Sequence, residues 1–271
     1  MLSVGSLCTG YGGLEMGLQA VYGDIDLRFV SDIDENASTL LAHHHPNVPN
    51  LGNLTVVDWA DIEPVDVLCA GYPCQPFSTA GQRKGLDDER AIFEYIADAI
   101  SVLRPRNVLL ENVAGHLTLG GTAVIATLTR LGYNTKWGIV RASDTGAPHQ
   151  RKRLFIWCES TNANSARLQR LRGECELAEN SGQKRFAWGD YEPAIRRWQT
   201  VMGRPAPYPA HKKGVNTVFV EWLMGLPEGY VTDIGLSRQA QLKILGNGVV
   251  PQQAALALQL LAEGGYYAKT A

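Results

Sequence analysis

A short apolar run, a glycine-rich turn and a helical pattern follow one another in Ser3-Val4-Gly5-Ser6-Leu7-Cys8-Thr9-Gly10-Tyr11-Gly12-Gly13-Leu14-Glu15. They predict a strand over Ser3–Leu7 and a helix over Gly13–Val21. Glycines in the turn let the backbone bend sharply and approach a ligand closely, and the helix N-terminus beyond them favours an anionic group. The spacings Gly-x-Gly-x-x-Gly and Gly-Lys-Ser/Thr are not found here, which disfavours dinucleotides and nucleoside triphosphates as ligands.

The alternation of apolar runs and helical patterns continues through the first 157 residues. It predicts βαβ units around a parallel sheet, and therefore an α/β fold. Further strands are expected at Leu27–Asp32, Val65–Gly71, Asn107–Glu111, Asn134–Val140 and Leu154–Cys158. Further helices are expected at Asp34–His44, Glu89–Leu103 and Gly121–Leu131.

The pattern breaks between residues 159 and 215. Thr161–Gln183 is polar and poor in large aliphatic side chains, and the proline-rich stretch Gly203–Pro209 predicts neither a helix nor a central strand. Order returns at Val218–Leu226, and Pro251 opens a last apolar helix over Gln252–Leu261. We therefore expect an α/β core interrupted by a smaller, irregular segment.

Size and composition indicate a globular protein. The chain has 271 residues, of which 45% are hydrophobic, as expected for one large domain or for a core domain with an appendage. We find no apolar run of about 18 residues and no basic segment ahead of an apolar stretch at the N-terminus, so neither a membrane span nor a secretory signal is expected. Five cysteines without a Cys-x-x-Cys pair argue against a disulfide framework and a metal site, and favour a reducing compartment.

Charge is unevenly distributed along the chain. Residues 141–213 contain 14 Lys and Arg against 7 Asp and Glu, whereas the remaining residues contain 11 against 20. A basic middle segment on an acidic body is typical of a local polyanion-binding surface, although a solvated charged surface would give the same bias.

An acidic residue ends the second predicted strand. Asp32 follows the glycines by about 20 residues, a position from which a carboxylate accepts hydrogen bonds from ribose hydroxyls. Capping of the next helix is the alternative role for Asp32. A ribose combined with a small anionic group points to S-adenosylmethionine, whose carboxylate would meet the amides of the glycine-rich turn.

A cysteine between two prolines follows the predicted strand Val65–Gly71, in Pro73-Cys74-Gln75-Pro76. The proline rings restrict the backbone on both sides of Cys74, so its thiol is stiffly aimed. Glu111 ends the next apolar run. Each residue alone is compatible with a buried cysteine or an exposed glutamate, but a nucleophilic sulfur and a proton-handling carboxyl on adjacent strand ends indicate covalent catalysis.

Six motifs in chain order resemble those of the DNA (cytosine-5)-methyltransferase family. They are Thr9-Gly10-Tyr11-Gly12-Gly13, the acid Asp32, Pro73-Cys74-Gln75, Glu111-Asn112-Val113, Arg151-Lys152-Arg153 and Gly246-Asn247-Gly248-Val249. The resemblance implies a Rossmann-like S-adenosylmethionine-dependent methyltransferase core with a small, irregular target-recognition domain. Residues 1–158 and 233–271 would form the catalytic and cofactor-binding domain, and residues 159–232 the recognition domain.

The resemblance also assigns four catalytic residues. Cys74 resembles the nucleophile that adds to carbon 6 of the target cytosine, and Glu111 resembles the carboxyl that hydrogen-bonds ring nitrogen 3 and the exocyclic amine. Arg153 would help to hold the carbonyl oxygen of the base, and Arg151 would support the loop. Because carbon 6 is inaccessible inside a duplex, the target cytosine must be flipped out of the helix.

S-adenosylmethionine is the implied methyl donor, with S-adenosylhomocysteine as its product. The positions carried over as cofactor-binding are Thr9, Gly10, Tyr11, Gly12, Gly13, Asp32, Ile33, Asn53, Leu54, Gly71, Pro73, Asn247, Gly248 and Val249. Asn53 stands where the family usually has an aspartate that accepts from the adenine amine. An Asn carbonyl can also accept, so we expect altered cofactor affinity and not its loss.

Duplex DNA with a short specific site is the implied substrate. The expected DNA contacts are Gln75, Ser78, Gln82, Arg83, Lys84, Arg185, Arg196 and Arg197. Residues 81–85 are expected to form a loop that closes over the flipped base, with an ordinary surface turn as the alternative.

Two other functions stay open at this point. One is a tRNA cytosine-5 methyltransferase with the same motifs, and the other is a non-catalytic DNA-binding relative, which the presence of both Cys74 and Glu111 disfavours. A cognate restriction endonuclease is a candidate partner, and no membrane partner is expected. We further expect a monomer in the bacterial cytoplasm, encoded by the bacterium or by a phage.

Overall fold

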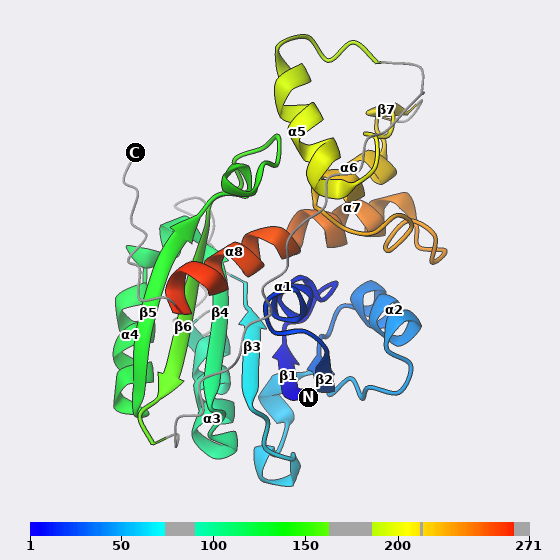
Figure 1. The fold of residues 1–271 in the computed structure, drawn as a ribbon. Helices are drawn as coiled ribbons and strands as arrows, with labels where there is room; N and C mark the ends of the chain where they lie inside the picture. The colour runs from blue at the N-terminus through cyan, green and yellow to red at the C-terminus, as the bar shows by residue number, and fades with distance from the viewer. Residues whose placement is uncertain (74–89, 163–185, 212–213, 263–271) are drawn as a thin grey trace, which may run out of the picture.

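The computed structural model describes residues 1–73, 90–162, 186–211 and 214–262. Its centre is a six-stranded sheet with the strand order β2-β1-β3-β4-β6-β5 (Figure 1). The strands are β1 (Leu2–Leu7), β2 (Ile25–Ser31), β3 (Val67–Gly71), β4 (Asn107–Val113), β5 (Tyr133–Val140) and β6 (Arg153–Ser160). All six strands predicted from the apolar runs are therefore confirmed, with ends that differ by a few residues.

The sheet is mixed, which corrects the expectation of a parallel sheet. The pairs β1–β2, β1–β3 and β3–β4 are parallel, but β6 pairs antiparallel with both β4 and β5. Only the short 3-10 helix η4 (Ala142–Thr145) lies between β5 and β6. A parallel pair needs a long crossover, usually a helix, so this connection brings the chain back antiparallel.

Helices cover both faces of the sheet (Figure 1). Helices α3 (Arg90–Leu103) and α4 (Gly121–Arg130) share one core with the sheet, to which Ile96, Ile100 and Leu128 contribute fully buried side chains. Helices α1 (Gly13–Tyr22) and α8 (Pro251–Ala262) cover the opposite face. The first and last described helices thus lie side by side on the sheet.

Glycine permits the close contact between α1 and α8. A Cβ atom on Gly17 would lie 2.6 Å from Cβ of Ala254 and 3.2 Å from the carbonyl oxygen of Pro251. Distances below about 3 Å are sterically forbidden, so a larger residue at position 17 would push the two helices apart.

The other regular elements are short. They are α2 (Glu35–His44), α5 (Glu192–Met202), α6 (Thr217–Leu223), α7 (Arg238–Asn247), β7 (Ala210–His211), β8 (Gly214–Val215), and the 3-10 helices η1 (Leu54–Val56), η2 (Trp59–Asp61), η3 (Ala114–Leu117) and η5 (Gly189–Tyr191). Asp34 begins α2 as its N-cap, where its carboxylate accepts from the backbone N–H groups of Asn36 and Ala37.

Helices α5 and α7 were not predicted from the sequence. In α5, Ile195 and Trp198 are buried three residues apart, and Pro193 lies in the first turn. In α7, Ser237 is the N-cap and accepts from the backbone N–H of Ala240. These start signals are present in the sequence. Helix α5 also has Ile195, Trp198 and Met202 at helical spacing, but it lies between residues 159 and 215, where an irregular segment was expected. In α7 the apolar residues Leu242, Ile244 and Leu245 do not follow a helical period.

A third core joins these helices to the rest of the molecule. Trp198 from α5 and Trp222 from α6 are fully buried, and they share a cluster with Tyr11, Leu40 and Leu245. The Nε1 of Trp198 donates to the carbonyl oxygen of Trp222 over 2.9 Å. The division of the chain into domains at residues 159 and 232 stays a prediction.

No helix within the described ranges is long and apolar enough to span a membrane.

Candidate active site

A cavity of about 450 Å³ lies beside the glycine-rich turn and the ends of β2, β3 and β4. Most predicted cofactor-binding residues line it, together with Glu111 and Arg153. They are Thr9, Gly10, Gly13, Asp32, Ile33, Asn53, Leu54, Gly71, Pro73, Asn247, Gly248 and Val249. Tyr11 and Gly12 do not line the cavity. The structure thus brings residues from both halves of the sequence to one place.

The glycine-rich turn is tied to the end of β2. Gly10 and Gly12 have φ angles of 60° and 84°, which glycine adopts readily. The backbone N–H of Gly10 donates to Oδ2 of Asp32 over 2.8 Å, and the N–H of Asp34 donates to Oδ1 of Asp32 over 2.9 Å. Because Asp34 and not Asp32 is the N-cap of α2, Asp32 holds the turn and still borders the cavity.

Tyr11 supports the cavity from behind. Its ring is fully buried, and its hydroxyl donates to the carbonyl oxygen of Val249 over 2.7 Å. A Cβ atom on Gly248 would lie 1.8 Å from the Tyr11 ring, and one on Gly13 would lie 2.1 Å from the carbonyl oxygen of Val249. The N-terminus of α1 and the segment after α7 therefore meet in direct backbone contact, which only glycines permit.

Asn53 uses its side-chain oxygen locally. Its Oδ1 accepts from the backbone N–H of Thr55 over 3.0 Å and from the hydroxyl of Thr55 over 2.9 Å. An amide oxygen has two lone pairs, and both are engaged in capping η1. A hydrogen bond from adenine to this oxygen would compete with Thr55, and the altered cofactor affinity expected from Asn53, which borders the cavity, stays a prediction.

Glu111 lies in β4 beside the end of β3, where Gly71 is its partner in the strand register. Its Oε1 forms an ion pair of 2.9 Å with Nε of Arg153, and only 8% of its side chain is exposed. Burial raises the pKa of Glu111 to about 7, while the charges of Arg153 and Arg151 act in the opposite direction. A carboxyl with that pKa gives up and takes up a proton readily near neutral pH.

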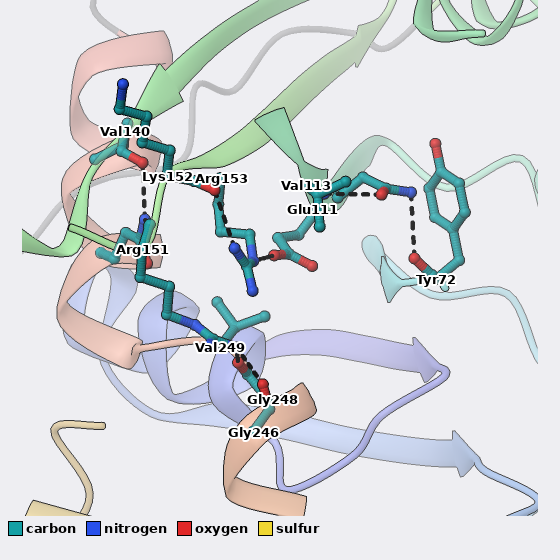
Figure 2. Close-up of polar contacts among 12 residues, drawn as sticks. Tyr72, Glu111, Val113, Val140, Arg151, Lys152, Arg153, Gly246, Gly248 and Val249 are labelled. Carbon is teal, nitrogen blue, oxygen red and sulfur yellow. Dashed lines mark hydrogen bonds and ion pairs between the residues drawn. The ribbon is translucent and has the colours of Figure 1, made fainter. Parts of the chain in front are cut away.

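Arg151 contacts the end of α7 and the residue that follows it. Its Nη2 donates to the carbonyl oxygens of Gly246 and Gly248 over 2.8 Å and 2.5 Å. Figure 2 shows the two arginines side by side, with the side chain of Arg153 reaching Glu111 and that of Arg151 reaching Gly246 and Gly248. The two arginines of one motif thus serve two different parts of the site.

The end of β3 is held by residues that the sequence reasoning did not single out. Nδ2 of Asn112 donates to the carbonyl oxygen of Tyr72 over 3.2 Å, and the Tyr72 hydroxyl and Nε2 of His116 are 2.9 Å apart. Asn112 follows Glu111 directly in the Glu111-Asn112-Val113 motif, so the motif itself was the signal. His116 had no such signal, because its partner Tyr72 is 44 residues away.

Several predicted residues lie outside the described part of the chain. They are Cys74, Gln75, Ser78, Gln82, Arg83, Lys84 and Arg185. The described chain reaches Pro73, which borders the cavity. Arg196 and Arg197 are both exposed on α5, where Nε of Arg196 pairs with Glu192 over 2.8 Å. Their contact with DNA stays a prediction.

A comparison with protein families agrees with this arrangement. The model of the C-5 cytosine-specific DNA methylase family matches residues 2–188, which include the glycine-rich turn, Glu111 and both arginines. The chain belongs to the C-5 cytosine-specific DNA methylase family. The resemblance inferred from the six motifs is therefore confirmed.

Two type II methyltransferases are similar to part of this chain. The chain is 35% identical over 162 residues to the type II methyltransferase M.NlaX of Neisseria lactamica, a match that covers 58% of this chain and 51% of that protein. It is 36% identical over 155 residues to M.NgoBI of Neisseria gonorrhoeae, covering 55% and 48%. This chain thus spans about half the length of the two methyltransferases that it matches.

Solved structures extend the comparison of the fold to nearly the whole chain. Dnmt2 methyltransferase of Schizosaccharomyces pombe superposes with a TM-score of 0.69 at 17% identity, covering 97% of this chain and 99% of that one. The methyltransferase EhMeth of Entamoeba histolytica superposes with a TM-score of 0.63 at 17% identity, covering 97% and 98%. The predicted α/β methyltransferase fold is confirmed.

Proposed function

We propose that this protein transfers a methyl group from S-adenosylmethionine to carbon 5 of cytosine in duplex DNA. The observation that carries the proposal is the Glu111–Arg153 pair, which borders the same cavity as the glycine-rich turn and the segment Gly246–Val249. Membership of the C-5 cytosine-specific DNA methylase family supports DNA as the substrate.

The cavity fits the proposed cofactor. Its volume of about 450 Å³ lies within the range of small-molecule sites. The N-terminus of α1 opens onto it at Gly13, where backbone N–H groups favour a carboxylate. Asp32 and Asn53 contribute polar groups for the nucleoside, and Asn247 for the methionine part. When bound there, S-adenosylmethionine supplies an electrophilic methyl group on its sulfonium sulfur.

The residues then divide the chemistry between them. The thiolate of Cys74 forms a bond to carbon 6 of the flipped cytosine, while the carboxyl of Glu111 gives a proton to ring nitrogen 3. The electron pair displaced in this way makes carbon 5 nucleophilic, and carbon 5 takes the methyl group. The proton on carbon 5 then passes to solvent, the Cys74 thiolate leaves carbon 6, and ring nitrogen 3 returns its proton to the carboxylate of Glu111, which restores the aromatic ring and both catalytic groups. Arg153 keeps the carboxyl of Glu111 in place at 2.9 Å.

Methyl transfer to synthetic substrates tests the proposal. We expect the protein to transfer labelled methyl groups from S-adenosylmethionine to duplex DNA and not to tRNA, with 5-methylcytosine as the product. Removing a nucleophile or a general acid lowers turnover by at least about 100-fold, so Cys74→Ser is expected to abolish transfer, and Glu111→Gln to lower turnover strongly with DNA binding retained.

Bisulfite sequencing of the methylated DNA would also define the recognition site. Methylation of tRNA without methylation of DNA would assign the protein to the alternative substrate. Full activity of the Cys74→Ser variant would refute the covalent mechanism.

A further inference from the structure

Gln253 lies in the first turn of α8 and is completely buried. Its Nε2 donates to the carbonyl oxygen of Val140 at the end of β5 and to that of Arg151, each over 2.8 Å. One side-chain amide thus joins the C-terminal helix, an edge strand and the arginine motif. Leaving two buried carbonyl groups without this donor is energetically costly.

The carbonyl group that Gln253 binds belongs to a residue with an unusual backbone. Arg151 has a φ angle of 32°, in the left-handed region that non-glycine residues rarely adopt. Such a conformation persists only where neighbouring contacts fix it. The hydrogen bond from Gln253 is a contact of this kind, because it acts on the peptide group that follows the φ angle.

The side chains of Arg151 and Arg153 contact two different parts of the cavity wall. The side chain of Arg151 binds the carbonyl groups on both sides of Asn247, in the segment that borders the cavity. Two residues further along, Arg153 pairs with Glu111 (Figure 2). A rotation of the Arg151 peptide would therefore move both the side chain that binds Gly246 and Gly248 and the partner of Glu111.

We propose that Gln253 is a positioning residue. Through the backbone of Arg151, it fixes the position of segment 151–153 relative to both the segment Gly246–Val249 and Glu111. This role rests on the proposed function, because it assumes that S-adenosylmethionine binds beside the segment Gly246–Val249 and that Glu111 takes part in methyl transfer. Gln253 does not line the cavity and acts through Arg151.

The neighbouring Gln252 provides a matched control. Its Nε2 donates over 2.9 Å to the carbonyl oxygen of Gly225, in the connection after α6. Like Gln253, it has a buried Oε1 atom without a hydrogen-bond partner among the described residues. Gln252 is half-buried and binds one backbone carbonyl group, whereas Gln253 is fully buried and binds two, so Gln252 controls for the loss of a glutamine donor at the start of α8 away from segment 151–153.

The test compares Gln253→Met with Gln252→Met, because methionine keeps the length of the side chain and removes the donor. Binding of S-adenosylhomocysteine is measured by calorimetry, and kcat and KM are measured with duplex DNA. We expect Gln253→Met to raise the Kd for S-adenosylhomocysteine by about tenfold, the size of a lost buried hydrogen bond, and to lower kcat. Gln252→Met is expected to lower the melting temperature without changing either Kd or kcat.

A double-mutant cycle separates positioning from general destabilisation. Arg151→Met removes Nη2, the donor to both carbonyl groups, and we expect its effect on the Kd to be no larger when Gln253→Met is also present. Additive effects, or equal effects of the two glutamine variants on the Kd, would overturn the proposal. Should Gln253→Met fail to fold, Gln253→Asn, which keeps a donor on a shorter side chain, takes its place in the same cycle.

The failure of the proposed function would look different. A wild-type protein that binds S-adenosylhomocysteine but methylates no DNA refutes the function, while the calorimetric cycle still decides the role of Gln253.

Discussion

At the scale of single residues, Glu111 combines deep burial with a cationic partner, and the two act on its pKa in opposite directions. Burial disfavours the ionised carboxylate, whereas Arg153 at 2.9 Å and Arg151 favour it. Burial has the larger effect, so the pKa is raised from 4.5 to about 7. The folded protein therefore keeps this carboxyl protonated up to about pH 7, so that it can donate a proton. Ionisation of Glu111 lowers the stability of the folded state.

The stability lost when Glu111 ionises gives a prediction for unfolding. The folded protein retains the Glu111 proton between pH 4.5 and about 7, where the unfolded chain has lost it. The free energy of unfolding of the wild type, relative to that of Glu111→Gln, should therefore fall by about 2 to 3 kcal/mol between about pH 5 and about pH 8. Urea unfolding of both proteins at the two pH values measures this difference. A difference that is constant or rises with pH would show that Glu111 is ionised throughout.

At the scale of elements, the contact between the start of α1 and the segment after α7 shapes the cavity. Tyr11 lies beneath Gly248 and binds the carbonyl oxygen of Val249, while Gly13 faces the same carbonyl group. Residues more than 230 positions apart thus form one wall. The dimensions of this wall depend on Gly13 and Gly248, which have no side chains.

Two substitutions in this segment should behave differently although they are only two residues apart. Gly248→Ala would place a methyl group 1.8 Å from the Tyr11 ring, so we expect about 1 to 3 kcal/mol of destabilisation together with weaker binding of S-adenosylhomocysteine. Gly246→Ala meets no atom within 4 Å among the described residues and lies in α7, so its stability should change by less than about 1 kcal/mol. Thermal unfolding and calorimetry measure both quantities. Equal effects of the two variants would contradict the close packing seen here.

The sequence predicted elements where local patterns are strong. Apolar runs identified all six strands of the sheet, and the glycine-rich turn identified the start of α1. The direction of β6 was wrong because it depends on the connection from β5, which has no apolar pattern of its own. Helix α5 was missed although Ile195, Trp198 and Met202 have helical spacing, because it lies in a stretch that was expected to be irregular. Helix α7 was missed because its apolar residues, such as Ile244 and Leu245, do not follow a helical period.

At the scale of the whole molecule, motifs far apart in the chain predicted which residues share a cavity, but not how they are connected. Family likeness placed Asp32, Glu111 and Asn247 together, and all three border it. The capping of η1 by Asn53 and the contacts of Gln253 with Val140 and Arg151 required three-dimensional structure. They depend on hydrogen bonds whose geometry no spacing in the sequence encodes.

The third hydrophobic core predicts how the molecule unfolds. Trp198 on α5 is fully buried in a cluster that also contains Tyr11 and Leu245, which lie at the cofactor end. Trp198→Ala should therefore destabilise the protein by about 3 to 5 kcal/mol and should also weaken binding of S-adenosylhomocysteine. Val201→Ala, on the same helix at a side chain that is 41% exposed, should change stability by less than about 1 kcal/mol.

Denaturant unfolding monitored by both tryptophan fluorescence and circular dichroism tests whether this core unfolds together with the sheet, since a shared core requires coincident transitions. Two separate transitions, with only the first shifted by Trp198→Ala, would instead show that α5 and α6 unfold independently of the sheet.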